Sequence, residues 1–169
     1  MNEKVAGLIN DQINKELYSA YLYLGFANYY ESVGLDGFAN WYEIQAQEER
    51  DHAMLFYRYL HNNGEKVTFK TIEQPESGFS GNTEPLKKGL EHEKYVTGLV
   101  NDIYMAAYED HDFRTMQFLN WFVKEQGEEE TNAAELITKM ELFGTDAKGL
   151  YALNNELKGR TYSAPSLRL

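Results

Sequence analysis

Glu49 and His52 are the two side chains of this sequence whose types and spacing most clearly suggest chemistry. They lie three residues apart within a long helical pattern, so an α-helix places both on the same face. A carboxylate and an imidazole on one face can bind a divalent cation together. A lone pair of this kind is also common on the surface of a helix, so the prediction depends on which residues face it.

Three other helical segments carry an acid or an amide where the helix should be apolar. These inward positions are occupied by Glu16, by Glu93, and by Gln126 together with Glu129. Buried carboxylates repel each other and lose the favourable energy of hydration. Helices that turn such residues inward are therefore expected to hold a cation between them.

The arrangement predicts two iron ions in one bundle. Known di-iron bundles use one Glu from each of two helices and a Glu-x-x-His from each of the other two. The first iron is expected to bind Glu16, Glu49 and His52. The second iron is expected to share Glu49 and to bind two further acids, Glu93 and Glu129.

The last long helical segment departs from this scheme. It offers Gln126-x-x-Glu129 in place of a second Glu-x-x-His. Gln126 is neutral and a weak ligand, so we expect it to lie beside the second iron and the two irons to be held unequally.

Further acids lie next to the predicted centre. Glu48 precedes Glu49, and Glu125 and Glu128 precede Glu129. Two unit charges at about 4 Å interact by about 4 kcal/mol at an effective dielectric constant of about 20. We therefore predict a third cation position formed by Glu48, Glu125, Glu128 and a shared Glu129. A solvated acidic face is the competing interpretation.

The elements that must position these residues are long helices. Apolar residues recur at spacings of three and four, and the chain has only three Pro. The pattern predicts helices over about 3–32, 36–62, 83–110, 112–143 and 146–157. Asp36, Thr83 and Asp112 are the expected N-caps of the second, third and fourth helices.

The polar segment 65–82 is expected to be a long crossover that returns the chain along the bundle. The predicted fold class is therefore all-α, a four-helix bundle with one crossover and a short fifth helix. Bundles of this kind include the ferritin-like folds. Residues 1–158 form the predicted domain, and the tail 159–169 has no recognisable pattern.

Composition restricts the partners. A net charge of −11 argues against nucleic acid and favours cations. The absence of Cys excludes disulfides and thiolate metal sites. No apolar run has the length of a membrane span, and the start lacks a signal-peptide core. We expect a soluble, cytoplasmic protein without membrane or nucleic-acid partners.

The segments 14–19, 47–52 and 118–130 together resemble the bacterial non-haem ferritins, and the similarity extends to about residue 157. The resemblance implies a homo-oligomeric, hollow 24-subunit shell with a ferroxidase centre inside each bundle. It implies oxidation of Fe(II) by dioxygen or hydrogen peroxide and storage of ferric oxyhydroxide. The predicted ligands match the three iron sites of the family, and Tyr23 matches a tyrosine near the centre that could supply an electron or a hydrogen bond.

Related groups fit less well. Bacterioferritins hold haem with a Met between the Glu and the His of the second helix, where this chain has Arg50, so no haem is expected. A di-iron peroxide-reducing enzyme without mineral storage is the alternative function, although the relay cysteines of such enzymes are missing. A helical interaction module without metal is a third possibility.

Overall fold

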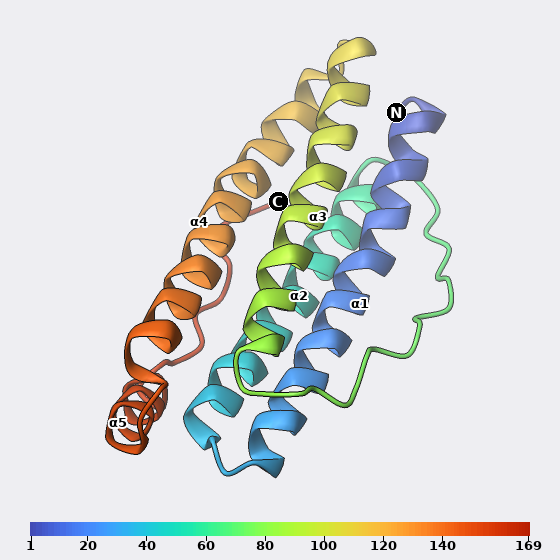
Figure 1. The fold of residues 1–169 in the computed structure, drawn as a ribbon. Helices are drawn as coiled ribbons and strands as arrows, with labels where there is room; N and C mark the ends of the chain where they lie inside the picture. Colours follow the sequence, from blue (N-terminus) through green and yellow to red (C-terminus); the bar gives the residue numbers. More distant parts are fainter.

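Four long helices run side by side in the computed structural model, which describes residues 1–169 (Figure 1). The structure has five helices and no strands, and their bounds are α1 Glu3–Ser32, α2 Asp36–Asn62, α3 Glu84–Glu109, α4 Phe113–Phe143 and α5 Ala147–Leu157. Short turns join α1 to α2 and α3 to α4, which gives two antiparallel hairpins. The long crossover makes α2 and α3 parallel, so the predicted all-α bundle with one crossover is confirmed.

Local sequence signals mark where several helices begin or end. Asn2 caps α1 by accepting a hydrogen bond from Lys4 N at 2.8 Å. Gly34 follows α1 with a φ of 77°, a backbone conformation that glycine adopts without strain. Asp112 caps α4 through Thr115 N, as predicted.

One of the predicted N-caps is wrong. Asp36 lies inside α2, and the preceding residue makes no side-chain cap bond. Asn154 of α5 supplies this cap instead, because its Oδ1 accepts hydrogen bonds from Gly37 N at 2.8 Å and Phe38 N at 3.3 Å. Thr83 is the N-cap residue of α3, as predicted, but it makes no side-chain cap bond.

The close packing of α5 on α2 depends on Gly37. A Cβ atom at this position would collide with the backbone carbonyl of Asn154. Asn154 also donates a hydrogen bond to Asp36 Oδ1 at 2.8 Å. The short fifth helix is therefore fixed to the N-terminal end of α2.

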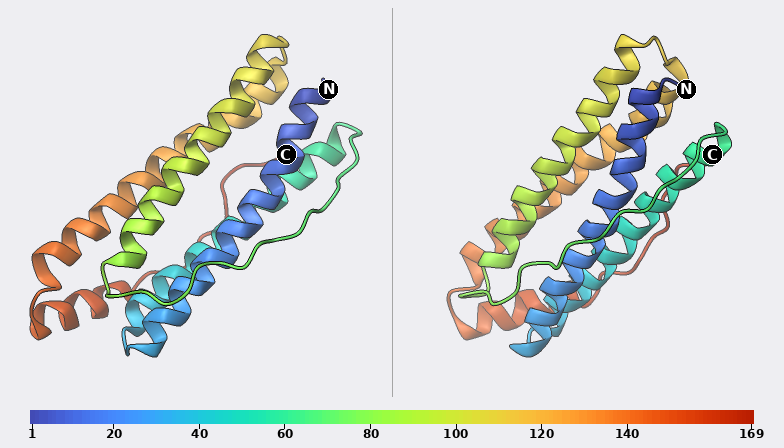
Figure 2. Two further views of the ribbon diagram at one scale, coloured as in Figure 1. Left: turned by 45° about the vertical axis from the view of Figure 1, so that its right-hand side comes forward. Right: turned by 90° about the vertical axis from the view of Figure 1, so that its right-hand side faces the viewer.

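The crossover and the C-terminal tail lie on different sides of the bundle (Figures 1 and 2). The crossover follows α1, where Asn10 pairs with both backbone groups of Thr68 and Asn14 donates to Thr71 O. The tail follows α2 and α4, where Tyr162 donates to Asp51 and Trp121 donates to Ser166. The tail, which has no recognisable pattern in the sequence, is thus docked along the bundle.

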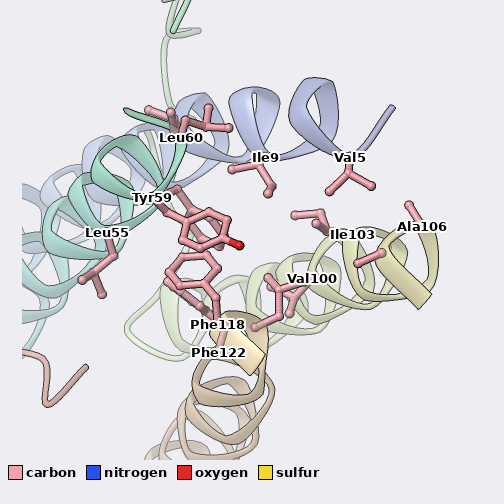
Figure 3. Close-up of a cluster of buried hydrophobic side chains, with 14 of the residues drawn as sticks. Val5, Ile9, Leu55, Tyr59, Leu60, Val100, Ile103, Ala106, Phe118 and Phe122 are labelled. Atoms are coloured by element: carbon pink, nitrogen blue, oxygen red, sulfur yellow. The ribbon is translucent and has the colours of Figure 1, made fainter. Parts of the chain in front are cut away.

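Two hydrophobic clusters fill the bundle, one towards each end. The first contains the side chains labelled in Figure 3, among them Val5, Ile9, Phe118 and Phe122. The second is built around Phe26, Phe38, Tyr42, Leu86 and Met140, from the opposite halves of the same four helices. Between the two clusters each long helix buries polar side chains, so the core is divided by a buried polar layer. None of the five helices combines the length and apolar character needed to cross a bilayer.

Candidate metal centre

The polar layer is built from the side chains predicted to bind metal. All four long helices contribute, and every member is at most 6% exposed: Glu16, Glu49, His52, Glu93, Gln126 and Glu129. Charged side chains are almost never buried to this degree unless they are paired or bind a cation.

Glu16, Glu49 and His52 form one compact group. Each offers one ligand atom, and these atoms all lie within 4.8 Å of one another. His52 Nδ1 lies 3.4 Å from Glu49 Oε2, as expected for residues three apart on a helix. The His52 ring is packed edge-on against Trp121 and Phe122, which fixes its orientation.

Glu93 lies on the other side of the layer and is held by two donors. The hydroxyl of Tyr23 donates to its Oε1 atom. Gln126 Nε2 lies 3.1 Å from Glu93 Oε2 and 3.2 Å from the Glu93 carbonyl oxygen. Tyr23 therefore has a hydrogen-bonding role in this structure, and Gln126 acts as a donor to Glu93.

Glu129 completes the layer from α4. Its Oε2 atom accepts a hydrogen bond from Gln45 Nε2 at 2.9 Å. A cavity of about 10 Å³ adjoins Gln45, Glu93 and Glu129 and extends to Asn132. This volume suits about one water molecule.

Burial makes the carboxylates of the layer resist ionisation. Burial, and then repulsion from Glu49, raise the pKa of Glu16. Burial, followed by repulsion from Glu93 and Glu129, raises the pKa of Glu49 well above its ordinary value. Burial and repulsion from Glu93 raise the pKa of Glu129 to about 7. These carboxylates are close enough to oppose one another's charge, so a cation between them would favour ionisation of all of them.

The hydrogen-bond network of the polar layer leaves two carboxylate oxygens without a donor. Glu16 Oε2 and Glu49 Oε1 are buried and have no hydrogen-bond partner. The other oxygen of Glu16 accepts from Gln12 Nε2 at 2.7 Å. Unsatisfied buried carboxylate oxygens are costly, whereas hard cations take such atoms as ligands. The residues present therefore fit a divalent cation.

The acids of the predicted third position have other partners. Glu48 Oε2 lies 2.6 Å from Arg160 Nη2. Glu128 is exposed and pairs with Lys124 at 3.2 Å. Glu125 is half-buried, and burial raises its pKa. The one group of three ligand atoms within 4.8 Å is that of Glu16, Glu49 and His52.

Three polar residues around the layer were not predicted to contact the site: Gln12, Gln45 and Arg160. A signal existed for the two amides, because each lies on the inward face four residues before a ligand candidate. Arg160 lies in the tail, where no periodicity places it, so nothing local could reveal its contact with Glu48.

A four-helix bundle with one crossover and inward Glu and His side chains defines the ferritin-like class of metal-binding bundles. The family model described as "Ferritin-like domain" matches residues 6–143, which is most of the chain. The chain belongs to the ferritin family.

Curated relatives agree with this assignment. The bacterial non-heme ferritin of Staphylococcus haemolyticus is 38% identical over 154 residues, which cover 91% of this chain and 93% of that protein. The bacterial non-heme ferritin of Staphylococcus epidermidis is 36% identical over 163 residues, covering 96% and 98%.

Solved structures show the same fold. An engineered closed form of the Archaeoglobus fulgidus ferritin superposes with a TM-score of 0.94 at 39% identity, covering 96% of this chain and 99% of that one. The open-pore ferritin of the same archaeon gives a TM-score of 0.93 at 39% identity, covering 95% and 98%.

Proposed function

We propose that this protein is an iron-storage ferroxidase. It binds two Fe(II) ions inside each bundle, oxidises them with dioxygen or hydrogen peroxide, and stores the product as ferric oxyhydroxide. The observation that supports this most directly is the buried group of Glu16, Glu49 and His52, with its two unpartnered carboxylate oxygens.

The first Fe(II) ion binds Glu16, Glu49 and His52. Gln12 holds one oxygen of Glu16 and leaves the unpartnered Oε2 atom for the metal. His52 supplies a terminal nitrogen ligand, since imidazole suits iron as well as zinc.

The second Fe(II) ion shares Glu49 and binds Glu93 and Glu129. Support comes from the repulsion that both acids exert on Glu49. An amide group holds one oxygen of each of these ligands, because Gln126 donates to Glu93 and Gln45 donates to Glu129. The second ion thus has more amide neighbours and no imidazole, so the two ions are held unequally.

The oxidation of two Fe(II) ions by one molecule of dioxygen or hydrogen peroxide balances in electrons and protons without any other redox group. Each of two Fe(II) ions gives up one electron, and dioxygen takes both electrons with two protons to leave as hydrogen peroxide. When peroxide is the oxidant, the same two electrons and two protons reduce it to two water molecules. The ligands are at most 6% exposed, so bulk water is kept away from the reacting atoms.

The storage shell is the second part of the proposal. Relatives named ferritin cover nearly the whole chain, and the match to a ferritin structure covers 96% of it. We infer a cytoplasmic homo-oligomer of 24 copies without haem. The net charge of −11 would concentrate cations near its surfaces.

Stopped-flow Fe(II) oxidation tests the ferroxidase step. Glu49→Ala and His52→Ala should each lower the initial rate by at least about a hundredfold, because each removes a metal ligand. Glu43→Ala and His61→Ala are matched controls, since both residues are exposed on the same helix and should leave the rate unchanged.

Two further measurements complete the test. Size-exclusion chromatography should show a hollow assembly far larger than one subunit, and aerobic iron loading should give a soluble mineral. Unchanged oxidation rates in both ligand variants would overturn the ferroxidase assignment. Rapid oxidation by a small oligomer that retains no mineral would favour the peroxide-reducing alternative.

A further inference from the structure

Arg160 is the cationic side chain in contact with Glu48, an acid next to the candidate metal centre. Its Nη2 atom lies 2.6 Å from Glu48 Oε2 and 2.5 Å from Gln45 Oε1. Its Nη1 atom donates to the Trp41 carbonyl at 3.1 Å, and the guanidinium lies 4.1 Å from the centre of the Trp41 ring. The side chains of Arg160 and Glu48 are only 17% and 16% exposed.

The contact with Gln45 has a consequence for Glu129. A guanidinium has only donors, so Gln45 must present its oxygen to Arg160 and its NH₂ group to the other side. That NH₂ group donates to Glu129 Oε2 at 2.9 Å. Arg160 therefore fixes one oxygen of Glu129 through Gln45 without touching the metal ligand itself.

The contact with Glu48 affects the predicted third cation position. Glu48 would be one of its four acids, yet its Oε2 atom already faces a positive charge. A metal ion and a guanidinium cannot both take this oxygen at close range, because two like charges would then lie side by side.

We propose that Arg160 is a tethered cation that closes the third cation position and acts as a positioning residue for Glu129. A metal ion binds at Glu48, Glu125 and Glu128 only by displacing the guanidinium from Glu48. The inference rests on the proposed function, since it assumes that two cations bind between the helices.

An anchoring role for the tail does not account for this placement. Asn40 holds the tail by donating to the carbonyl oxygens of Leu157 and Arg160, each at 3.1 Å. Tyr162 and Ser166 make further hydrogen bonds to the long helices. The tail should therefore stay docked when the Arg160 side chain is shortened.

Anaerobic Co²⁺ titration of the metal-free shell is the test, because Co²⁺ absorbs visible light and accepts oxygen and nitrogen ligands without redox change. The wild-type protein should bind two ions tightly and a third weakly. Arg160→Gln should bind the third ion about tenfold more tightly, because a competing charge is removed. Arg160→Lys keeps the positive charge, so it should bind the third ion as weakly as the wild-type protein does.

Lys158→Gln is the matched control, because it removes a positive charge two residues away that pairs with Asp36. It should leave the third affinity unchanged. Glu48→Gln in the Arg160→Gln background should abolish the gain. An equal gain in Lys158→Gln, no gain in Arg160→Gln, or a gain that survives loss of Glu48 would overturn the proposal.

Crystals of the wild-type protein soaked in Co²⁺ provide a second test that needs no variant. Where anomalous scattering places a third ion at Glu48, the Arg160 side chain should have moved away from it. A third ion at Glu48 with the Arg160 pair intact would overturn the proposal. Failure of the wild-type protein to bind even two ions would instead refute the proposed function.

Discussion

Glu16 and Glu49 bring their carboxylates together between α1 and α2, and each keeps one buried oxygen without a hydrogen-bond donor. Neither oxygen can reach water, and the charge of Glu49 raises the cost of ionising Glu16. The metal-free protein therefore holds an arrangement that is unfavourable for folding and suited to binding a cation.

Glu16→Gln should stabilise the metal-free protein. The new amide can donate to Glu49 at the position of the unpartnered oxygen, and one buried negative charge is removed. We expect a gain of about 1–2 kcal/mol in the free energy of unfolding. Thermal unfolding after chelation measures it, and added Co²⁺ should stabilise the variant less than the wild-type protein.

Glu31→Gln is the control for this change, because Glu31 is exposed near the end of the same helix. It should alter neither the metal-free stability nor the response to Co²⁺. A Glu16→Gln protein that is less stable without metal, or equally stabilised by Co²⁺, would show that the unpartnered oxygens are not a binding feature.

The stability of the metal-free protein should fall as pH rises through neutrality. Burial raises the pKa of Glu129 from about 4.5 to about 7. The protonated form is favoured in the folded state, so this contribution is complete below about pH 4.5 and is lost as pH rises through about 7. Between about pH 6 and about pH 8 the loss from Glu129 is about 1 kcal/mol.

A bound divalent cation should remove this slope, since it favours the ionised form of Glu129. Unfolding midpoints across this pH range, with and without Co²⁺, check the prediction. Glu129→Gln should flatten the slope of the metal-free protein. The absence of a slope would mean that Glu129 is already ionised in the metal-free fold.

The sequence predicted the bundle well because each helix carries its own evidence. Inward residues recur along α1 at spacings of three and four, and nearly all of them are buried. Glu49 and His52 could be paired by the same local rule, since residues three apart share a helix face.

What the sequence could not show are contacts between residues far apart in the chain. Asn154 caps α2 from a helix more than a hundred residues away, where local rules favoured Asp36. Arg160 reaches Glu48 from a tail without periodicity. Both contacts depend on how α5 and the tail dock, and docking is decided by tertiary packing rather than by local pattern.

Tyr23→Phe should weaken binding of the second cation. Its hydroxyl donates to Glu93 Oε1, and its pKa is raised by burial and by Glu93, so it remains a donor at neutral pH. Loss of one hydrogen bond to a charged group should lower the second affinity about tenfold and leave the first unchanged. Stepwise Co²⁺ titration resolves the two affinities.

Tyr42→Phe is the control for Tyr23. Its ring lies 5.5 Å from that of Tyr23 and is equally buried in the aromatic cluster, but its hydroxyl makes no hydrogen bond to Glu93. It should leave both affinities unchanged. Equal effects of the two variants would assign the role to aromatic packing instead of the hydrogen bond.

Asn154→Ala should loosen α5 and destabilise the fold. The side chain caps α2 through Gly37 N and Phe38 N, and α2 has no cap of its own. Loss of a cap costs about 1–2 kcal/mol. Asn155→Ala is the matched control, because Asn155 is exposed on the same helix and Ala favours helix formation more than Asn.

Two measurements separate these variants. Thermal unfolding should show a lower midpoint for Asn154→Ala and an equal or higher one for Asn155→Ala. Limited proteolysis should cut Asn154→Ala first within residues 144–169, because α5 is fixed to the bundle mainly at the start of α2. Equal losses in both variants would attribute the effect to α5 itself and would leave the cap on α2 without an energetic role.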